Sequence, residues 1–119
     1  MSMPSVAKKV ALAAGLAVFR VVAAGPVDVD SWNSAYDPAV LTTSAIAEGK
    51  ARILVVRHDK GPGGWQLYDG ADPSARAPAV LLKSRALELE PALAQVTDLP
   101  VGWIATRSGP AASWVRMKR

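Results

Sequence analysis

Two neighbouring stretches near the middle of the chain carry its clearest hydrophobic pattern. Residues 51–58 contain the apolar run Ile53-Leu54-Val55-Val56, which is rich in β-branched side chains and is typical of a central strand. A glycine-rich turn follows over residues 59–64, and Trp65–Tyr68 then alternates in character, as the return strand of a hairpin does. The pattern therefore predicts that the two stretches pair as adjacent strands.

Further short strands and helices are predicted along the chain, separated by polar loops at residues 26–38 and 71–78. Ser44 and Ser84 can each cap a helix, Gly49 can end one, and Pro91 suits a first helical turn. We predict short helices at residues 44–48, 84–89 and 91–94, and strands at residues 40–43, 79–82, 103–106 and 113–116. The last two strands form a hairpin. These elements indicate an α+β fold, with a small, mainly antiparallel sheet, short helices and an N-terminal helix.

The N-terminal segment admits more than one interpretation. Residues 10–19 form an uncharged apolar run, which is shorter than the roughly 20 residues that cross a bilayer. The basic Lys8-Lys9 pair and the small residues before Gly25 match a secretory signal, but Arg20 interrupts the apolar stretch. The apolar residues instead recur at helical spacing, which favours a helix packed on the domain. These residues are Val6, Val10, Ala13, Leu16 and Ala17. We interpret residues 1–25 as an apolar N-terminal helix, with a signal or a mis-assigned start as the alternatives, and residues 26–119 as a single α+β domain.

Composition narrows the class of protein further. The chain has 119 residues, of which 50% are hydrophobic and 20% are charged, as in one ordinary globular domain. Because there is no cysteine, disulfides, thiolate metal sites and cysteine nucleophiles are excluded. The net charge of +4 is concentrated at the two ends of the chain. No nucleic-acid recognition motif accompanies these basic ends, so we expect no specific nucleic-acid partner. We also expect no transmembrane segment and a cytoplasmic location, with export as the alternative if the N-terminal segment is a signal.

Residues with reactive side chains do not form a recognisable catalytic or metal-binding pattern. His58 is the single histidine, so a zinc site would have only carboxylates as partners. Glu88 and Glu90 are two residues apart and point to different sides of a helix, and Asp69 and Asp72 lack the rest of a calcium loop. We therefore predict no catalytic residues, no metal and no cofactor. The alternative is a small-ligand-binding or enzymatic domain that uses Asp69, Glu88 or His58 in a cleft.

Four tryptophans are the unusual feature of the composition, beside one phenylalanine and two tyrosines. Most are expected in the core, which is the commoner place for a large amphipathic ring. Trp65 follows a turn that we expect to be exposed, and it is the best candidate for an interface. The candidate interaction surface comprises Trp65, Tyr68, Asp69 and Arg107.

Several motifs together resemble a known group of proteins. They are Leu54-Val55-Val56-Arg57-His58-Asp59, Gly64-Trp65-Gln66-Leu67-Tyr68-Asp69-Gly70 and Asp98-Leu99-Pro100-Val101-Gly102-Trp103, with Ala105, Arg107 and Trp114. The chain resembles small, functionally uncharacterised bacterial proteins with a Trp-Gln hairpin and a Leu-Pro-x-Gly-Trp ending. That group is similar to the immunity-protein family of bacterial polymorphic toxin systems. The hairpin loop in such proteins tends to be acidic, whereas this chain has Lys60-Gly61-Pro62.

The resemblance covers residues 41–114 and implies an α+β fold without known catalysis. It supplies no active-site residues. The favoured interpretation is a bacterial protein-interaction module that is not an enzyme, with toxin immunity as its specific form and a cognate protein, such as a toxin, as its partner.

Overall fold

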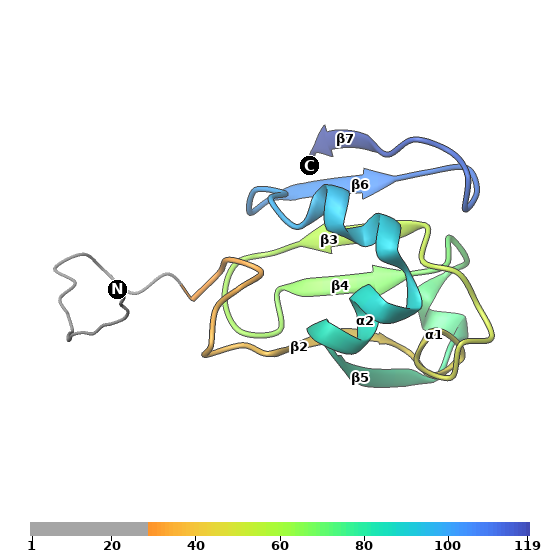
Figure 1. Cartoon of the computed structure of the whole chain (residues 1–119), viewed down its shortest axis with the longest axis horizontal. Coiled ribbons are helices and arrows are strands. Elements are labelled where there is room, and N and C mark those ends of the chain that lie inside the picture. Colours follow the sequence, from red (N-terminus) through yellow and green to blue (C-terminus); the bar gives the residue numbers. More distant parts are fainter. Residues whose placement is uncertain (1–28) are drawn as a thin grey trace, which may run out of the picture.

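A six-stranded sheet organises residues 29–119, which are the residues that the computed structural model describes (Figure 1). Its strands are β2 (Ala39–Thr43), β3 (Val55–His58), β4 (Trp65–Tyr68), β5 (Pro78–Leu82), β6 (Trp103–Thr106) and β7 (Val115–Lys118). They lie in the order β5-β2-β4-β3-β6-β7, and within this sheet only β2 and β4 pair in parallel. The expected small, mainly antiparallel sheet with short helices is confirmed. The N-terminal helix predicted in residues 1–25 lies outside the described residues.

The hairpin predicted from the central hydrophobic pattern is present. Strands β3 and β4 pair in antiparallel register, with Val55 opposite Tyr68 and His58 opposite Trp65. The first strand is shorter than the predicted 51–58: β3 begins at Val55, and residues 51–54 lie before it. The backbone of Ile53 is bonded by side chains instead of by a neighbouring strand: its N–H donates to Glu90 and its carbonyl accepts from Arg107.

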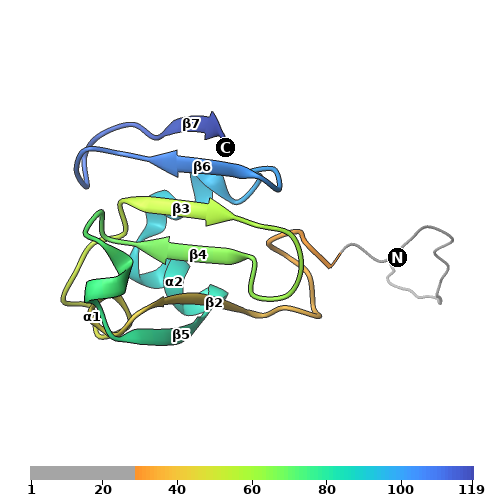
Figure 2. The same cartoon turned by 180° about the vertical axis from the view of Figure 1, so that it is seen from behind.

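Short helices connect the strands, and two of them cover one face of the sheet. These two are α2 (Lys83–Leu89) and the 3-10 helix η2 (Pro91–Val96), which lie in front of the strands in Figure 1. Figure 2 shows the opposite face of the sheet, which α2 and η2 leave uncovered. The remaining helices are α1 (Ser44–Ala47) and the 3-10 helix η1 (Pro73–Ala75). The second of these forms a helical turn within residues 71–78, which the sequence pattern predicted to be a loop.

The helix caps differ from the predicted ones. Helix α1 is capped by Thr43, whose hydroxyl accepts a hydrogen bond from the Ile46 N–H at 3.4 Å, so Ser44 is the first helical residue. Helix α2 begins at Lys83 after Leu82, which offers no side-chain oxygen. Both serines were predicted to be caps because of their residue type. Helix α1 begins at the predicted residue 44, whereas α2 begins one residue before the predicted 84, and each helix directly follows its strand.

The last strand is also displaced from its predicted position. Strand β7 covers Val115–Lys118 rather than residues 113–116, and it pairs with β6 so that Thr106 faces Val115. Trp114 precedes the strand, and its indole N–H donates to the Ala92 carbonyl of η2 at 3.0 Å. The C-terminal hairpin is therefore confirmed, with its second strand shifted by two residues.

The hydrophobic core lies between the sheet and the helices. The sheet contributes its alternate residues, and the helices and turns contribute their apolar sides; the most deeply buried members are Val40, Ile46, Ile53, Val56, Trp65, Leu67, Ala86, Leu93, Val96, Leu99 and Ala105. Because side chains alternate along a strand, the other half of the sheet's residues point to the face that the helices leave uncovered.

Candidate functional site

The uncovered face of the sheet, which we call the open face, is defined by one row of side chains that crosses all its strands. In β4, Trp65 and Leu67 are buried, which places Gln66 and Tyr68 on the other side. Gln66 is opposite Leu41 in β2 and opposite Arg57 in β3, and the register continues to both edges of the sheet. In strand order the row is Val80, Leu41, Gln66, Arg57, Ile104 and Met117. Partners opposite each other in register share a face.

The open face gathers most of the exposed apolar side chains in the described part of the chain. Eight large hydrophobic residues there are exposed, and five of them belong to strands β2, β5 and β7 on this face: Leu41, Val80, Leu82, Val115 and Met117. Val80 and Met117 are 67% and 56% exposed, which is more than a buried sheet face allows. Gathered apolar side chains of this kind mark interaction sites, whereas scattered ones are ordinary.

A groove lies at the β2–β5 side of the open face. Its volume is about 420 Å³, and its lining includes Leu41, Tyr68, Pro73, Arg76 and Val80. The loop that contains η1 supplies the Pro73 and Arg76 side of the groove. The lining is mainly apolar with one charged side chain, so the groove suits an apolar group with a polar edge.

Two aspartates hold the loop beside this groove. Asp69, whose side chain is only 10% exposed, forms an ion pair with Arg76 at 2.9 Å. Asp72 accepts hydrogen bonds from the hydroxyl and the N–H of Ser74, and these bonds lower the pKa of its carboxyl. Both carboxylates are therefore engaged in holding the loop. Within residues 29–119, no group of three or more His, Asp or Glu side chains is placed to hold a metal ion.

A chain of polar contacts runs through the middle of the open face. The Tyr68 hydroxyl donates to Gln66 Oε1 at 3.0 Å, and Gln66 Nε2 donates to Asp59 Oδ2 at 2.8 Å. Arg119 donates to the other oxygen of Asp59. Arg57 approaches the same carboxylate only at 3.8 Å, through its NH2 group. The face therefore has apolar side chains on both sides of a polar centre.

Trp65, the best interface candidate from the sequence, is buried with 1% of its surface exposed. Its ring stacks on His58 with centroids 3.8 Å apart and meets Trp32 edge-on at 5.1 Å. Its indole N–H donates to the Asp30 carbonyl. Trp65 therefore offers no surface to a partner, because strand alternation directs it with Leu67 to the covered face. The same alternation in the sequence could have predicted that Trp65 points to the core.

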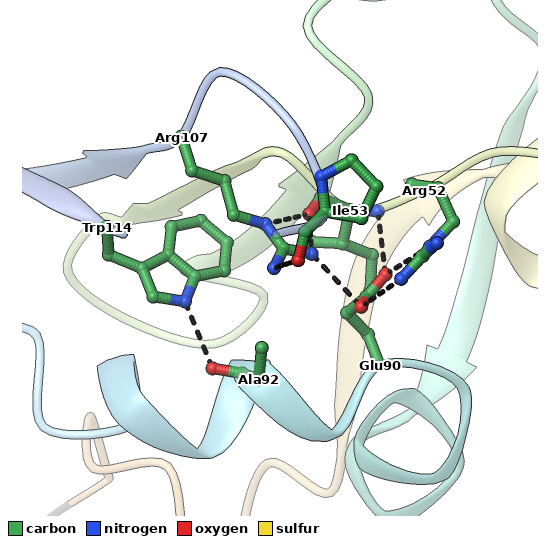
Figure 3. Close-up of polar contacts among 7 residues, drawn as sticks. Arg52, Ile53, Glu90, Ala92, Arg107 and Trp114 are labelled. Atoms are coloured by element: carbon green, nitrogen blue, oxygen red, sulfur yellow. Dashed lines mark hydrogen bonds and ion pairs between the residues drawn. The ribbon is translucent and has the colours of Figure 1, made fainter. Parts of the chain in front are cut away.

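Arg107, another residue of the candidate surface, is also buried, and belongs to a structural ion-pair network (Figure 3). Its guanidinium donates twice to the Ile53 carbonyl and contacts Glu90 at 3.0 Å. The Trp114 ring lies against it, with 4.6 Å from the guanidinium carbon to the ring centroid. Arg107 continues the covered-face alternation of Trp103 and Ala105 in β6, so it points inward. The candidate surface thus loses Trp65 and Arg107. Tyr68 lines the groove and Asp69 pairs with Arg76 in its wall, and their part in an interface stays a prediction.

Glu90 is the centre of this network. Its side chain is 5% exposed, and both of its oxygens accept hydrogen bonds from Arg52, at 2.9 and 2.8 Å. The hydrogen bonds from Arg52, and then those from Arg107, lower the pKa of Glu90 to about 2, against the opposing effect of burial. Glu90 is therefore ionised and fully partnered, which is the condition of a carboxylate that holds a fold together rather than one that exchanges protons.

The three residues named for an enzymatic alternative do not come together. His58 is 4% exposed on the covered face, and its Nδ1 lies 2.6 Å from the Leu99 carbonyl. Glu88 is an exposed residue of α2 that pairs with Arg85. Asp69 follows the end of β4 remote from Trp65, the strand partner of His58. No shared cleft connects these three groups in the described part of the chain.

No helix among residues 29–119 has the length and apolar character needed to cross a membrane. Comparisons of the chain with protein-family models, curated proteins and solved structures find no match.

Proposed function

We propose that this chain is a protein-interaction module that acts without catalysis, and that its protein partner binds the open face of the sheet. The observation that carries the proposal is the gathering of five exposed apolar side chains on one sheet face, together with a groove of about 420 Å³ at its β2–β5 side. A non-obligate interface needs a rigid surface with apolar anchors and a few polar groups. It does not need reactive groups that converge on one point.

The specific form that we favour is an immunity protein of a bacterial toxin system, with a cognate toxin as the partner and the cytoplasm as the location. The support is the resemblance of the Trp-Gln hairpin and of the Leu-Pro-x-Gly-Trp ending. In the fold, the alternate residues of the hairpin motif have separate tasks. Trp65 and Leu67 build the core, whereas Gln66 and Tyr68 lie on the open face. If residues 1–25 act as a signal, the same surface would serve a partner outside the cytoplasm.

The partner test uses the protein encoded by the neighbouring gene, produced together with this chain. Leu41→Glu places a charge on the open face beside the groove, and Val101→Glu is its matched control. Both residues are aliphatic and similarly exposed, at 44% and 41%, but Val101 lies in the turn before β6, outside the row that defines the open face. We expect Leu41→Glu to weaken the complex by about 2 kcal/mol or more, which is roughly 30-fold, and Val101→Glu to leave it unchanged.

Two further readouts make the test specific. The far-ultraviolet circular dichroism and the thermal midpoint of both variants should match those of the parent chain, because both positions are at the surface. If the partner is a toxin, cells that produce it should survive with the parent chain or with Val101→Glu and die with Leu41→Glu. Equal binding by all three chains would show that the partner uses another surface.

A second candidate function is the binding of a small apolar ligand in the groove, because its volume lies within the range of small-molecule sites, about 300–1,000 Å³. A small-molecule thermal-shift screen distinguishes this candidate. Hits whose shift disappears in Val80→Glu and persists in Val101→Glu would support it, and an absence of such hits would count against it.

A further inference from the structure

Arg57 differs from every other arginine that the structure describes. The six others in residues 29–119 each contact a carboxylate oxygen at 3.0 Å or less: Arg52, Arg76, Arg85, Arg107, Arg116 and Arg119. Arg57 has only the 3.8 Å approach to Asp59, which is too long for a hydrogen bond. Its Nε is buried and has no hydrogen-bond partner within the described residues. The Arg57 guanidinium therefore has N–H groups that can donate to a further acceptor.

The nearby carboxylate does not meet this need because other groups already hold it. Asp59 Oδ2 accepts from Gln66 at 2.8 Å, and Asp59 Oδ1 accepts from Arg119. Gln66 is itself fixed by the Tyr68 hydroxyl. These hydrogen bonds hold the Asp59 carboxylate where it lies, 3.8 Å from the Arg57 guanidinium. The arrangement therefore keeps Asp59 near enough to hold the guanidinium in place and too far to satisfy it.

The surroundings of Arg57 make it a strong binding group once a partner covers it. It occupies the fourth strand position of the open-face row, between Gln66 and Ile104. Since neighbouring strands lie about 4.8 Å apart, Leu41 and Met117 stand about 10 Å from it on opposite sides. A partner that rests on those apolar residues removes water from the guanidinium, and a charge-assisted hydrogen bond is stronger in such a site than in water.

We infer that Arg57 is the specificity-determining residue of the open face, and that it binds a carboxylate of the partner flanked by apolar side chains about 10 Å to either side. This inference rests on the proposed function. The partner segment thus has an Asp or Glu with apolar residues about three positions away if it is extended, or about seven if it is helical. The apolar side chains cover Leu41 with the groove on one side, and Ile104 with Met117 on the other.

Charge favours a separate acidic partner over the two other possible occupants. The chain's own apolar N-terminal run is flanked only by Lys8, Lys9 and Arg20, and no acid precedes Asp28, so it brings no carboxylate to Arg57. A second copy stacked on this face would bring the two Arg57 guanidinium groups, neither of which has a carboxylate within hydrogen-bond distance, toward each other, which is unfavourable for like charges. Only a partner with an acidic group supplies what the face lacks.

The test first selects binding peptides from a random library and then measures how much their binding depends on an acidic residue. A random peptide library displayed on phage, with peptides of about 20 residues so that one can cross the sheet, is panned against the full chain. The enriched peptides are synthesised in acid and amide forms, with Asp changed to Asn or Glu to Gln. Their Kd values are measured for the parent chain, Arg57→Gln, Leu41→Glu and Arg85→Gln. The last is a matched control, because Arg85 is a surface arginine of α2, on the covered side.

The expected result is a shared acidic residue between apolar ones. Arg57→Gln and the acid-to-amide change should each weaken binding by about 10- to 100-fold, with little further loss when they are combined, and Arg85→Gln should have no effect. Peptides that depend on Leu41 but on neither Arg57 nor an acid would overturn this inference and leave the proposed function standing. Peptides that bind Leu41→Glu as tightly as the parent chain would overturn both this inference and the proposed function.

The other occupants give their own signatures in the same preparations. A dimer in analytical ultracentrifugation that Leu41→Glu dissociates would show that a second copy occupies the face. If Leu16→Glu in the full chain shifts the amide resonances of Leu41 and Ile104, the N-terminal run occupies it. Either result would overturn the assignment of a separate acidic partner.

Discussion

Replacing Glu90 with glutamine removes the carboxylate that neutralises the buried Arg107 guanidinium. Glutamine has nearly the same shape, so the change tests charge rather than packing. Arg52 can turn toward water, since its side chain is 56% exposed, whereas the Arg107 side chain is 1% exposed and cannot. The substitution therefore leaves a positive charge inside the protein without its counter-charge, which is strongly destabilising.

The pKa of Glu90 gives the magnitude. Folding lowers it from an ordinary 4.5 to about 2, and each unit corresponds to about 1.4 kcal/mol, so the ionised carboxylate stabilises the fold by about 3 kcal/mol at neutral pH. Because the folded-state pKa is the lower of the two, this contribution is complete above about pH 5 and is lost as the pH falls toward 2. We expect Glu90→Gln to cost a similar amount at pH 7 and nearly nothing at pH 2.

Urea unfolding followed by tryptophan fluorescence measures the cost of Glu90→Gln at pH 7 and at pH 2. Glu88→Gln is the matched control, because Glu88 lies two residues away, is 68% exposed and pairs only with Arg85. It should change the free energy of unfolding by less than about 0.5 kcal/mol. The other carboxyl groups titrate in both chains, so the difference between parent and Glu90→Gln isolates Glu90. Equal costs for the two substitutions, or a cost for Glu90→Gln that does not shrink in acid, would refute this account of the network.

Two further predictions concern stability. Lys83→Met should raise the free energy of unfolding at pH 7 by about 1 kcal/mol, because the Lys83 amine is buried without a hydrogen-bond partner in the described part of the chain. Burial lowers the pKa of this amine, and the negative charge of Asp37 partly opposes that effect. The parent should also gain stability as the pH rises toward 10.5, the ordinary pKa of lysine, and the variant should lack this gain; a less stable variant in thermal melts would show that the amine is satisfied. Gly64→Ala should lower the thermal midpoint strongly, because its Cβ would lie 2.0 Å from the Asp59 carbonyl oxygen, whereas Gly109→Ala, with nothing within 4 Å, should change stability by less than about 0.5 kcal/mol. Similar melts for the two alanine variants would contradict the tight β3–β4 turn.

The hairpins could be predicted from the sequence because they depend on local signals. The apolar run, the glycine turn and the Trp-Gln stretch lie next to one another, so pairing β3 with β4 needs no long-range information. The parallel pairing of β2 with β4 joins segments about 25 residues apart, Leu41 with Gln66, and no local pattern specifies it. This pairing links strands β5 and β2 to strands β4, β3, β6 and β7 and thereby completes the open face.

The candidate site was harder to predict because residue type was a poor guide to direction. A tryptophan after a turn and an arginine after a strand were both expected at the surface. Trp65 shares a face with Leu67, and Arg107 shares one with Ala105, so both point to the core. The alternation of each strand contained this information. The ion pair between Arg107 and Glu90 joins two separate elements, and only the fold brings them together.

The central claim, that the open face is the binding surface, is tested most directly by the isoleucine methyl groups. The described residues contain three isoleucines: Ile104 on the open face, and Ile46 and Ile53 in the core, each 1% exposed. In a complex of the methyl-labelled chain with an unlabelled, high-affinity peptide from the panning experiment, saturation of the peptide protons should weaken the Ile104 signal and leave the Ile46 and Ile53 signals unchanged. An unchanged Ile104 signal in a saturated complex would contradict the claim.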